Sequence, residues 1–196
     1  AATLLAETLP NAAYPGNVLV VAGSGGNGGD GLYAGAELAR AGHHVEAIKV
    51  GTRIHERAAA AFEHAGGQFV TKLGDYDLVI DGIIGLGGSK GLSDDLAALL
   101  ARCAGTPILA IDVPSGINPD TGVPMGAHIT ATATVTFGAL RYAHAVSPAC
   151  GEVVVGDIGI APQGSHVQVY RSVGTGRAWP EGRVPIPRTP ATESLV

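Results

Sequence analysis

Short apolar runs alternate with longer helical patterns up to about residue 116 of this 196-residue chain. Apolar runs without polar interruption are typical of strands buried on both faces of a parallel sheet. The pattern predicts strands at 17–23, 44–50, 68–70, 77–82 and 107–116, the last running into a turn, and helices at 30–42, 54–67 and 93–105, the last with Ser93 as N-cap. This rhythm predicts right-handed crossovers and a parallel sheet with helices on both faces.

The pattern changes after residue 130. We expect strands at 132–138, 151–160 and 166–173, without long helices between them, as extensions or an edge of the same sheet. The stretch 174–196 is proline-rich and aperiodic, which is typical of a tail or linker. The predicted division is therefore a domain at 1–173 and a tail at 174–196.

Composition narrows the class of protein. Apolar residues make up 46% and charged residues 15% of the chain, as in compact globular proteins. The net charge of −5 offers no basic field, which disfavours a nucleic-acid partner. Two cysteines at a spacing unlike a metal framework favour a reducing, cytoplasmic location. We see no membrane-spanning run and no signal peptide, and expect no membrane partner.

A glycine-rich stretch, GSGGNGGDG at 23–31, separates the first strand from the first helix. Its bare N–H groups and the helix dipole predict an anion cradle. The stretch fits the dinucleotide pattern G-x-G-x-x-G, but that signal is weak alone. The second strand ends with Lys49 where dehydrogenases carry an acid, and no Gly-Lys-Ser/Thr follows the glycines. An ordinary nicotinamide dehydrogenase and a Walker site are both disfavoured.

Three aspartates, Asp30, Asp81 and Asp112, follow or end predicted strands, where parallel sheets bind ligands. Together they would repel a phosphate, unless a cation lies among them or one carboxyl does proton chemistry at a raised pKa. Asn27 and Ser115 add neutral oxygens, so an all-oxygen site for a hard cation is predicted. The residues leave potassium and magnesium both open.

Simpler interpretations stand beside these. Asp30 could serve only the helix dipole from the first turn, and Asp112 could be only a turn former. Lys90 and Arg141 are either phosphate ligands or solvated cations. The seven histidines show no metal spacing, and most are expected at the surface or at helix ends. Ser115 lacks the nucleophile-elbow pattern, so a serine hydrolase is disfavoured.

Five stretches occur in an order that resembles the YjeF N-terminal domain family of NAD(P)H-hydrate epimerases, over residues 15–160. They are GSGGNGGDGLYAGAELARAGHHV, DLVIDGIIGLGGSKGL, ILAIDVPSGINPDTG, ITATATVTFGALRYAH and GEVVVGDIGI. The resemblance implies a Rossmann-like three-layer α/β/α sandwich with a mostly parallel central sheet, and a homodimer. It implies interconversion of the R and S forms of hydrated NADH and NADPH (NADHX and NADPHX). A partner ADP/ATP-dependent dehydratase, often fused behind this domain, repairs only the S form.

The resemblance also assigns residues. It implies a substrate-binding set consisting of Gly26, Asn27, Gly28, Gly29, Asp30, Gly85, Leu86, Gly87, Gly88, Ser89, Lys90, Gly91 and Asp112. It implies one potassium ion per subunit (K+), held by Asn27, Asp81 and Ser115. We further predict that Asp112 is the catalytic acid–base group.

Three features depart from the family pattern. The first loop often has two asparagines, and here the first is Gly26. Arg141 stands where a lysine is usual, and it would be a poor proton-transfer group because it stays protonated. By the resemblance, we expect the amino-terminal helices of the family to lie before residue 1, outside this sequence. The alternative is a non-catalytic nucleotide-binding or scaffold protein of the same fold, which has no need for all of Asn27, Asp30, Asp81 and Asp112.

Overall fold

The computed structural model of the chain describes residues 16–156 and 158–159. Its sheet contains β1 (Asn17–Ala22), β2 (His44–Lys49), β3 (Gln68–Phe69), β4 (Leu78–Gly82), β5 (Ile108–Ile111), β6 (Ala133–Phe137) and β7 (Glu152–Gly156). The strand order is β3-β2-β1-β4-β5-β6-β7, and every pair is parallel. The helices are α2 (Gly26–Arg40), α3 (Glu56–His64), α4 (Asp94–Leu100) and α5 (Tyr142–Val146), with 3-10 turns η1 (Ala101–Cys103) and η2 (Pro148–Cys150).

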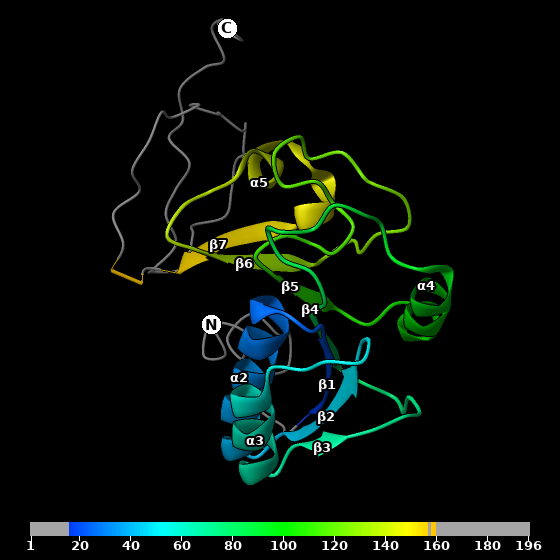
Figure 1. Cartoon of the computed structure of the whole chain (residues 1–196), viewed down its shortest axis with the longest axis vertical. Helices are drawn as coiled ribbons and strands as arrows, with labels where there is room; N and C mark the ends of the chain where they lie inside the picture. The colour runs from blue at the N-terminus through cyan, green and yellow to red at the C-terminus, as the bar shows by residue number, and fades with distance from the viewer. Residues whose placement is uncertain (1–15, 157, 160–196) are drawn as a thin grey trace, which may run out of the picture.

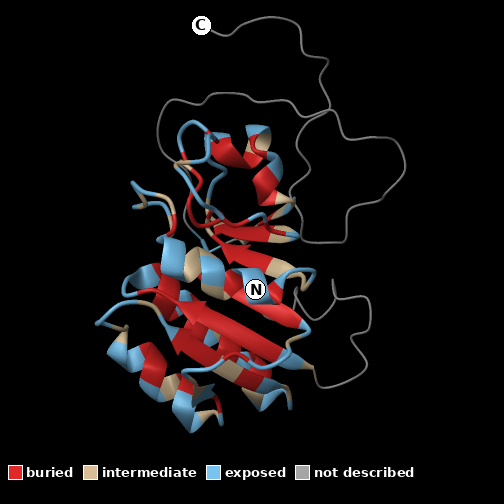
Figure 2. Cartoon of the chain, turned by 90° about the vertical axis from the view of Figure 1, so that its right-hand side faces the viewer, coloured by how far each residue is buried: buried red, intermediate tan, exposed pale blue. Residues whose placement is uncertain are grey.

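Helices cover both faces of the sheet. Helices α2 and α3 lie on one side and α4 on the other (Figure 1). Along β1, Val18 and Val20 pack in one core with Phe62 of α3, whereas Leu19 and Val21 pack in a second core. This alternation buries both faces, and the strands are almost entirely buried in Figure 2. The predicted Rossmann-like three-layer α/β/α sandwich is confirmed.

Helix α2 begins at Gly26, so our prediction of a helix at 30–42 was wrong at its start. Glycine is a poor helix former, which favours assigning these residues to a loop. Close packing overrides that preference, because a Cβ on Gly28 would lie 1.9 Å from the carbonyl oxygen of Gly23. Asp30 therefore lies beyond the first turn, which contains no acidic residue. The simpler interpretation, that Asp30 serves only the helix dipole from the first turn, was therefore wrong.

The later part of the chain extends the same sheet, as predicted. Strands β6 and β7 continue it beyond β5. Helix α5 lies between them and was missed because it is only five residues long. A third apolar cluster fixes this region and contains Val113, Ile117, Ala143, Ala149 and Cys150. The predicted strand at 166–173 and tail at 174–196 lie outside the described residues.

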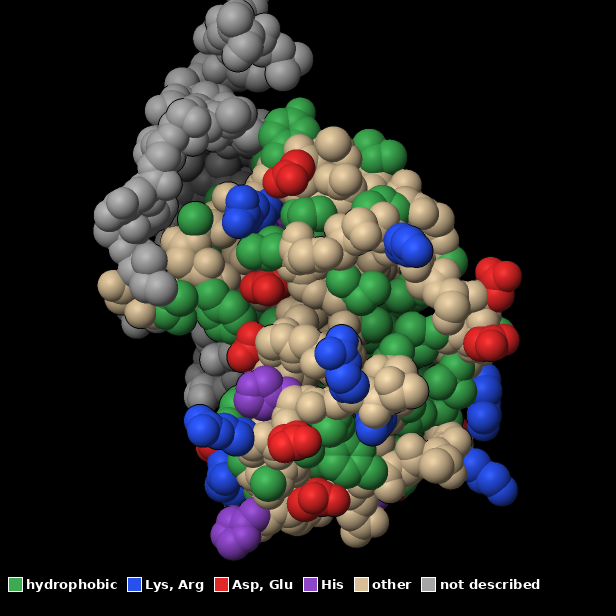
Figure 3. All heavy atoms as spheres, in the orientation of Figure 1, with side chains coloured by type: hydrophobic (Ala, Val, Ile, Leu, Met, Phe, Trp, Pro, Cys, Tyr) green, Lys and Arg blue, Asp and Glu red, His purple; other side chains and the backbone are tan. Residues whose placement is uncertain are grey.

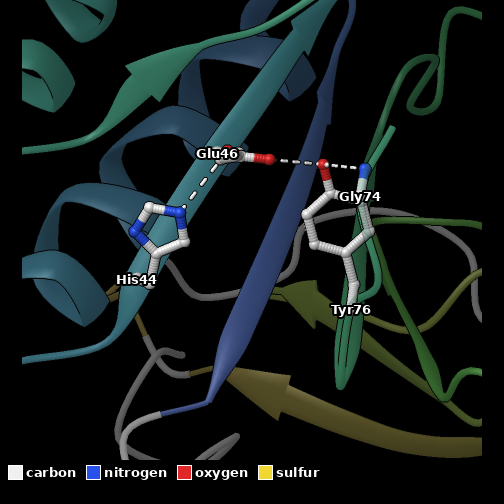
Figure 4. Close-up of polar contacts among 4 residues, drawn as sticks. All are labelled: His44, Glu46, Gly74 and Tyr76. Carbon is white, nitrogen blue, oxygen red and sulfur yellow. Dashed lines mark hydrogen bonds and ion pairs between the residues drawn. The ribbon is translucent and has the colours of Figure 1, made fainter. Parts of the chain in front are cut away.

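A polar cluster links β2 to the segment before β4 (Figure 4). The Tyr76 hydroxyl donates to Glu46 Oε2 at 2.5 Å and accepts from the Gly74 N–H at 3.2 Å. His44 Nε2 lies 3.4 Å from Glu46 Oε1. Burial, and then the bond to Glu46, raise the pKa of Tyr76 to about 12. The cluster lies toward the beginning of β2, away from the strand ends that carry the glycine stretch, so it serves the fold.

Candidate active site

The carboxyl ends of β4 and β5 bring two predicted site residues into direct contact. Asp81, in β4, pairs in register with Val21 and Ala110. The Ser115 N–H donates to Asp81 Oδ2 at 2.8 Å, and the Ser115 hydroxyl donates to Asp81 Oδ1 at 2.6 Å. Both side chains are buried. These two hydrogen bonds connect the turn after β5 to the end of β4.

The three predicted cation ligands converge on one short segment after β4. Asp81 Oδ1 accepts from the N–H of residue 83 at 3.2 Å, and Ser115 Oγ accepts from the N–H of residue 84 at 3.0 Å. We assign the Asn27 amide with its nitrogen toward the Ile111 carbonyl at 3.1 Å and its oxygen toward the Gly85 N–H at 3.3 Å, because this orientation gives both atoms a suitable hydrogen-bond partner. Three successive amides are thus held by three oxygens that come from three separate crossovers.

The Asp81 carboxylate is buried with neutral partners. Its hydrogen bonds come from Ser115 and from the backbone of residue 83. Burial raises the pKa of Asp81 to about 6, and these hydrogen bonds oppose the rise. No ion pair to it occurs among residues 16–156 and 158–159. A buried negative charge without a cationic side chain is an environment that favours a bound cation.

Asp112 occupies an unusual backbone conformation at the end of β5. Its φ is +65°, and within the described part of the chain Asp112 is the only non-glycine residue with a positive φ. Aspartate tolerates this left-handed region better than most residues, yet the conformation is strained and clusters at functional sites. The Asp112 N–H donates to the Val135 carbonyl at 2.7 Å. The residue is therefore held by the sheet, beyond what a simple turn former requires.

The carboxyl group of Asp112 faces the same segment as Asn27. A Cβ placed on Gly85 would lie 2.8 Å from Asp112 Oδ2 and 2.9 Å from the end of the Asn27 side chain. Burial raises the pKa of Asp112, the charge of Asp30 raises it further, and Arg141 opposes both. Asp30 and Arg141 consequently lie close enough to act on Asp112. A carboxyl with a raised pKa suits proton transfer.

His144 is a residue that the sequence interpretation missed. We expected most histidines at the surface or at helix ends, but His144 is buried within α5. Its Nδ1 accepts from the Arg141 N–H at 2.8 Å, which leaves Nε2 to donate to the Asp112 carbonyl at 2.6 Å. Burial lowers the pKa of His144 and favours this neutral tautomer. His144 is a positioning residue for Asp112, and no sequence spacing signals a contact that spans 32 positions.

His55 lies on the other side of the glycine stretch. It caps α3 by accepting from the Ala58 N–H at 3.2 Å, and its ring packs on Gly29, where a Cβ would lie 2.9 Å away. Burial raises the pKa of Asp30, and His55 opposes the rise. Asp30 is exposed, and its charge acts on Asp112 as well as interacting with His55. The structure thus places Asp30 at the open side of the site.

The second predicted substrate loop, residues 85–91, joins the cluster mainly through Gly85. The loop turns at once, because the Gly88 N–H donates to the Gly85 carbonyl at 3.0 Å. Leu86, Gly87, Ser89 and Lys90 are exposed. Gly91 packs against the backbone of 125–127 at 3.0 Å from its would-be Cβ. The substrate-binding roles of these exposed residues remain predictions.

A doubly wound parallel sheet with a glycine-initiated helix, and with acidic and amide groups gathered at its strand ends, defines the class of Rossmann-like α/β domains. The chain belongs to the family described as YjeF-related protein N-terminus, whose model matches residues 1–143. A solved structure, yeast ynu0, shares the fold with a TM-score of 0.67 at 17% identity, covering 85% of this chain and 82% of that chain.

Curated relatives carry repair-enzyme names. The chain is 47% identical over 175 residues to the bifunctional NAD(P)H-hydrate repair enzyme Nnr of Corynebacterium glutamicum, with 76% of this chain and 30% of that protein covered. It is 38% identical to the NAD(P)H-hydrate epimerase of Clavibacter michiganensis, with 84% and 82% covered. The chain spans about a third of the length of the bifunctional relatives it matches.

Proposed function

We propose that this chain is an isomerase that interconverts the R and S forms of NADHX and NADPHX, and so serves nicotinamide cofactor repair. The observation that carries the proposal is the meeting of Asp112 and Asn27 at Gly85, beside the glycine-built start of α2. The family and the names of the relatives support the same activity. The N–H groups of the first α2 turn suit the substrate's phosphates.

Asp112 is the proposed acid–base group. A proton donated to the ring hydroxyl lets it leave as water, with positive charge developing on the ring; water then adds to the other face of the ring, and the proton it loses returns to the carboxylate. The step therefore consumes and releases no net proton. A carboxyl with a raised pKa holds the proton closer to neutral pH, and its charged form stabilises a cation developing on the ring. Asp30 is the proposed anchor or second carboxylate.

The residues present fit a potassium ion. Asn27, Asp81 and Ser115 would hold it, because their side chains converge on residues 83–85, and the Asn27 oxygen, Asp81 Oδ2 and Ser115 Oγ each accept one hydrogen bond, which leaves a lone pair on each. Within the described part of the chain, no group of three His, Cys, Asp or Glu side chains suits a metal, so neutral oxygens must supply most of such a site. When bound, the ion supplies positive charge that balances Asp81 and attracts phosphate.

The activity is tested with a single epimer. The purified chain is incubated with the R form of NADHX, and the S form is followed by chromatography. We expect the S form to accumulate to equilibrium much faster than in buffer. If a folded chain binds 5′-AMP but leaves the epimers at the spontaneous rate, the non-catalytic alternative replaces this proposal.

The cation is tested by stability, independently of activity. We expect thermal unfolding at a midpoint about 2–4 °C higher in KCl than in tetramethylammonium chloride of equal ionic strength, because an ion that binds only the folded chain stabilises it. Asp81→Asn should abolish the difference. Asp94→Asn, which removes an exposed carboxylate from the first turn of α4, should keep it. Equal midpoints of the unchanged chain in the two salts would rule the site out.

Other expectations remain predictions. The relatives named bifunctional support a dehydratase partner, fused or separate, for the S form. The homodimer and the cytoplasmic location stay predictions of the resemblance and the composition. None of the described helices combines the length and the apolar character that a membrane span requires.

A further inference from the structure

A hollow lies at the carboxyl ends of β2 and β3, on the other side of β1 from β4 and β5. Its volume is about 610 Å³, and it is open to solvent. Ile48, Ile54, Ala59, Phe69 and Val70 form an apolar wall. The remaining lining residues are Lys49, Glu63 and Thr71. A largely apolar hollow with a few polar groups is the form of a small-molecule subsite.

The sheet places this hollow in line with the candidate active site. Lys49 pairs with Ala22 at the end of β1, and the Val50 N–H donates to the Ala22 carbonyl at 2.8 Å. The glycine stretch begins at the next residue, Gly23. Strand order puts β2 and β3 on one side of that stretch and β5, with Asp112, on the other. From β5 to β2 is three strand spacings, roughly 14 Å.

The hollow carries a charge suited to phosphate. Lys49 ends β2 and is exposed, and none of the carboxylates in the described chain forms an ion pair with it. In Rossmann-like sites an acid at this strand end accepts from the ribose 2′-hydroxyl of NAD, whereas a cation accommodates the 2′-phosphate of NADP. Arg53, four residues after Lys49, and Lys72, next to Thr71, are also exposed. Figure 3 shows lysine and arginine side chains beside hydrophobic surface on one face of the molecule, without identifying them individually.

Glu63 is the acidic residue of the lining, and any ligand proposed for the hollow has to be compatible with its negative charge. It lies near the end of α3, whereas Lys49 ends β2. The amino group of adenine is a hydrogen-bond donor, which suits a carboxylate. The apolar wall suits the adenine ring. The two charged residues of the lining, Lys49 and Glu63, thus each have a counterpart in one adenosine 2′-phosphate group.

We propose that this hollow binds the adenosine 2′-phosphate end of the substrate, and that Lys49 makes the chain prefer NADPHX over NADHX. The inference rests on the proposed function, since it assumes a dinucleotide whose nicotinamide end lies at Asp112. Lys49 acts as a point charge on the phosphate and does not touch the reacting ring.

The test measures binding, so it does not depend on turnover. Calorimetric titrations compare adenosine 2′,5′-bisphosphate with adenosine 5′-monophosphate. We expect the unchanged chain to bind the bisphosphate about tenfold more tightly, as one charge-assisted contact would give. Lys49→Ala should abolish this preference and leave the affinity for the monophosphate within about twofold. Arg40→Ala, a loss of charge at the far end of α2, is the matched control and should keep the preference.

The outcomes separate the two proposals. Equal affinities in the unchanged chain, no binding of either nucleotide, or a preference that survives Lys49→Ala would each overturn the subsite. Loss of the preference in Lys49→Ala supports it, whether or not the chain interconverts epimers. The proposed function fails on a different result, which is the absence of S-form accumulation by the folded chain.

Discussion

Asp112→Asn is expected to lower the rate of epimer interconversion by about 10²–10⁴-fold, the range of a lost acid–base group. Asparagine matches aspartate in shape but cannot exchange a proton in this way. It also tolerates the left-handed backbone conformation that Asp112 adopts, so φ of +65° needs no change. The backbone bonds to Val135 and His144 involve only the peptide groups of residue 112 and should persist.

The measurement is the initial rate from the R form of NADHX, together with the midpoint of thermal unfolding. Asp120→Asn is the matched control, because Asp120 is exposed in the turn after β5 and its carboxylate forms no ion pair within the described chain. The control should retain the normal rate. An Asp112→Asn chain that equilibrates the epimers at the normal rate would show that another group transfers the proton.

Gly28→Ala is expected to reduce the free energy of unfolding by about 3 kcal/mol, at the upper end of the usual overpacking cost. The added Cβ would lie 1.9 Å from the carbonyl oxygen of Gly23 and 2.8 Å from its nitrogen. Both are backbone atoms at the end of β1, where the Gly23 N–H also donates to the Gly82 carbonyl at 3.0 Å. Relief therefore requires a shift of α2 or of the strand end.

Gly26→Ala provides the matched control in the same helical turn. Nothing lies within 4 Å of a Cβ on Gly26, and alanine is a better helix former than glycine. This variant should unfold at the same denaturant concentration or slightly higher. Chemical denaturation of both variants measures the difference. Equal midpoints for the two would mean that the start of α2 does not approach β1 as closely as described.

The sequence predicted local features correctly where residues close together in the chain determine them. Ser93 was predicted as the N-cap of α4, and its hydroxyl accepts from the Leu96 N–H at 3.4 Å. The buried strands were predicted from uninterrupted apolar runs, because a parallel sheet covered on both faces requires them. The start of α2 was not readable, since glycine propensity indicates a loop and only the packing against Gly23 reveals the helix.

The candidate site, like the fold, was predicted only in part from the sequence. The sequence predicted that Asp81, Asp112 and Ser115 lie close together, because all three are at the carboxyl ends of predicted strands and parallel strands have these ends on the same side of the sheet. Which atoms meet did not follow. The side chains of Asn27 and Asp112 reach the same glycine, and the His144 ring supports the Asp112 carbonyl, from segments separated by tens of residues.

The sequence by itself determined the layered parallel fold, the edge of the sheet that bears the chemistry, and the oxygen-rich character of the site. These depend on periodicity and on residue type, which are local properties. Three features were decided only by the tertiary structure. Oxygens from three crossovers accept hydrogen bonds from residues 83–85, Asp112 adopts a left-handed backbone conformation next to the buried His144, and a hollow forms beside Lys49. Those features depend on distances between segments far apart in the chain, and such distances are set by packing of the whole domain.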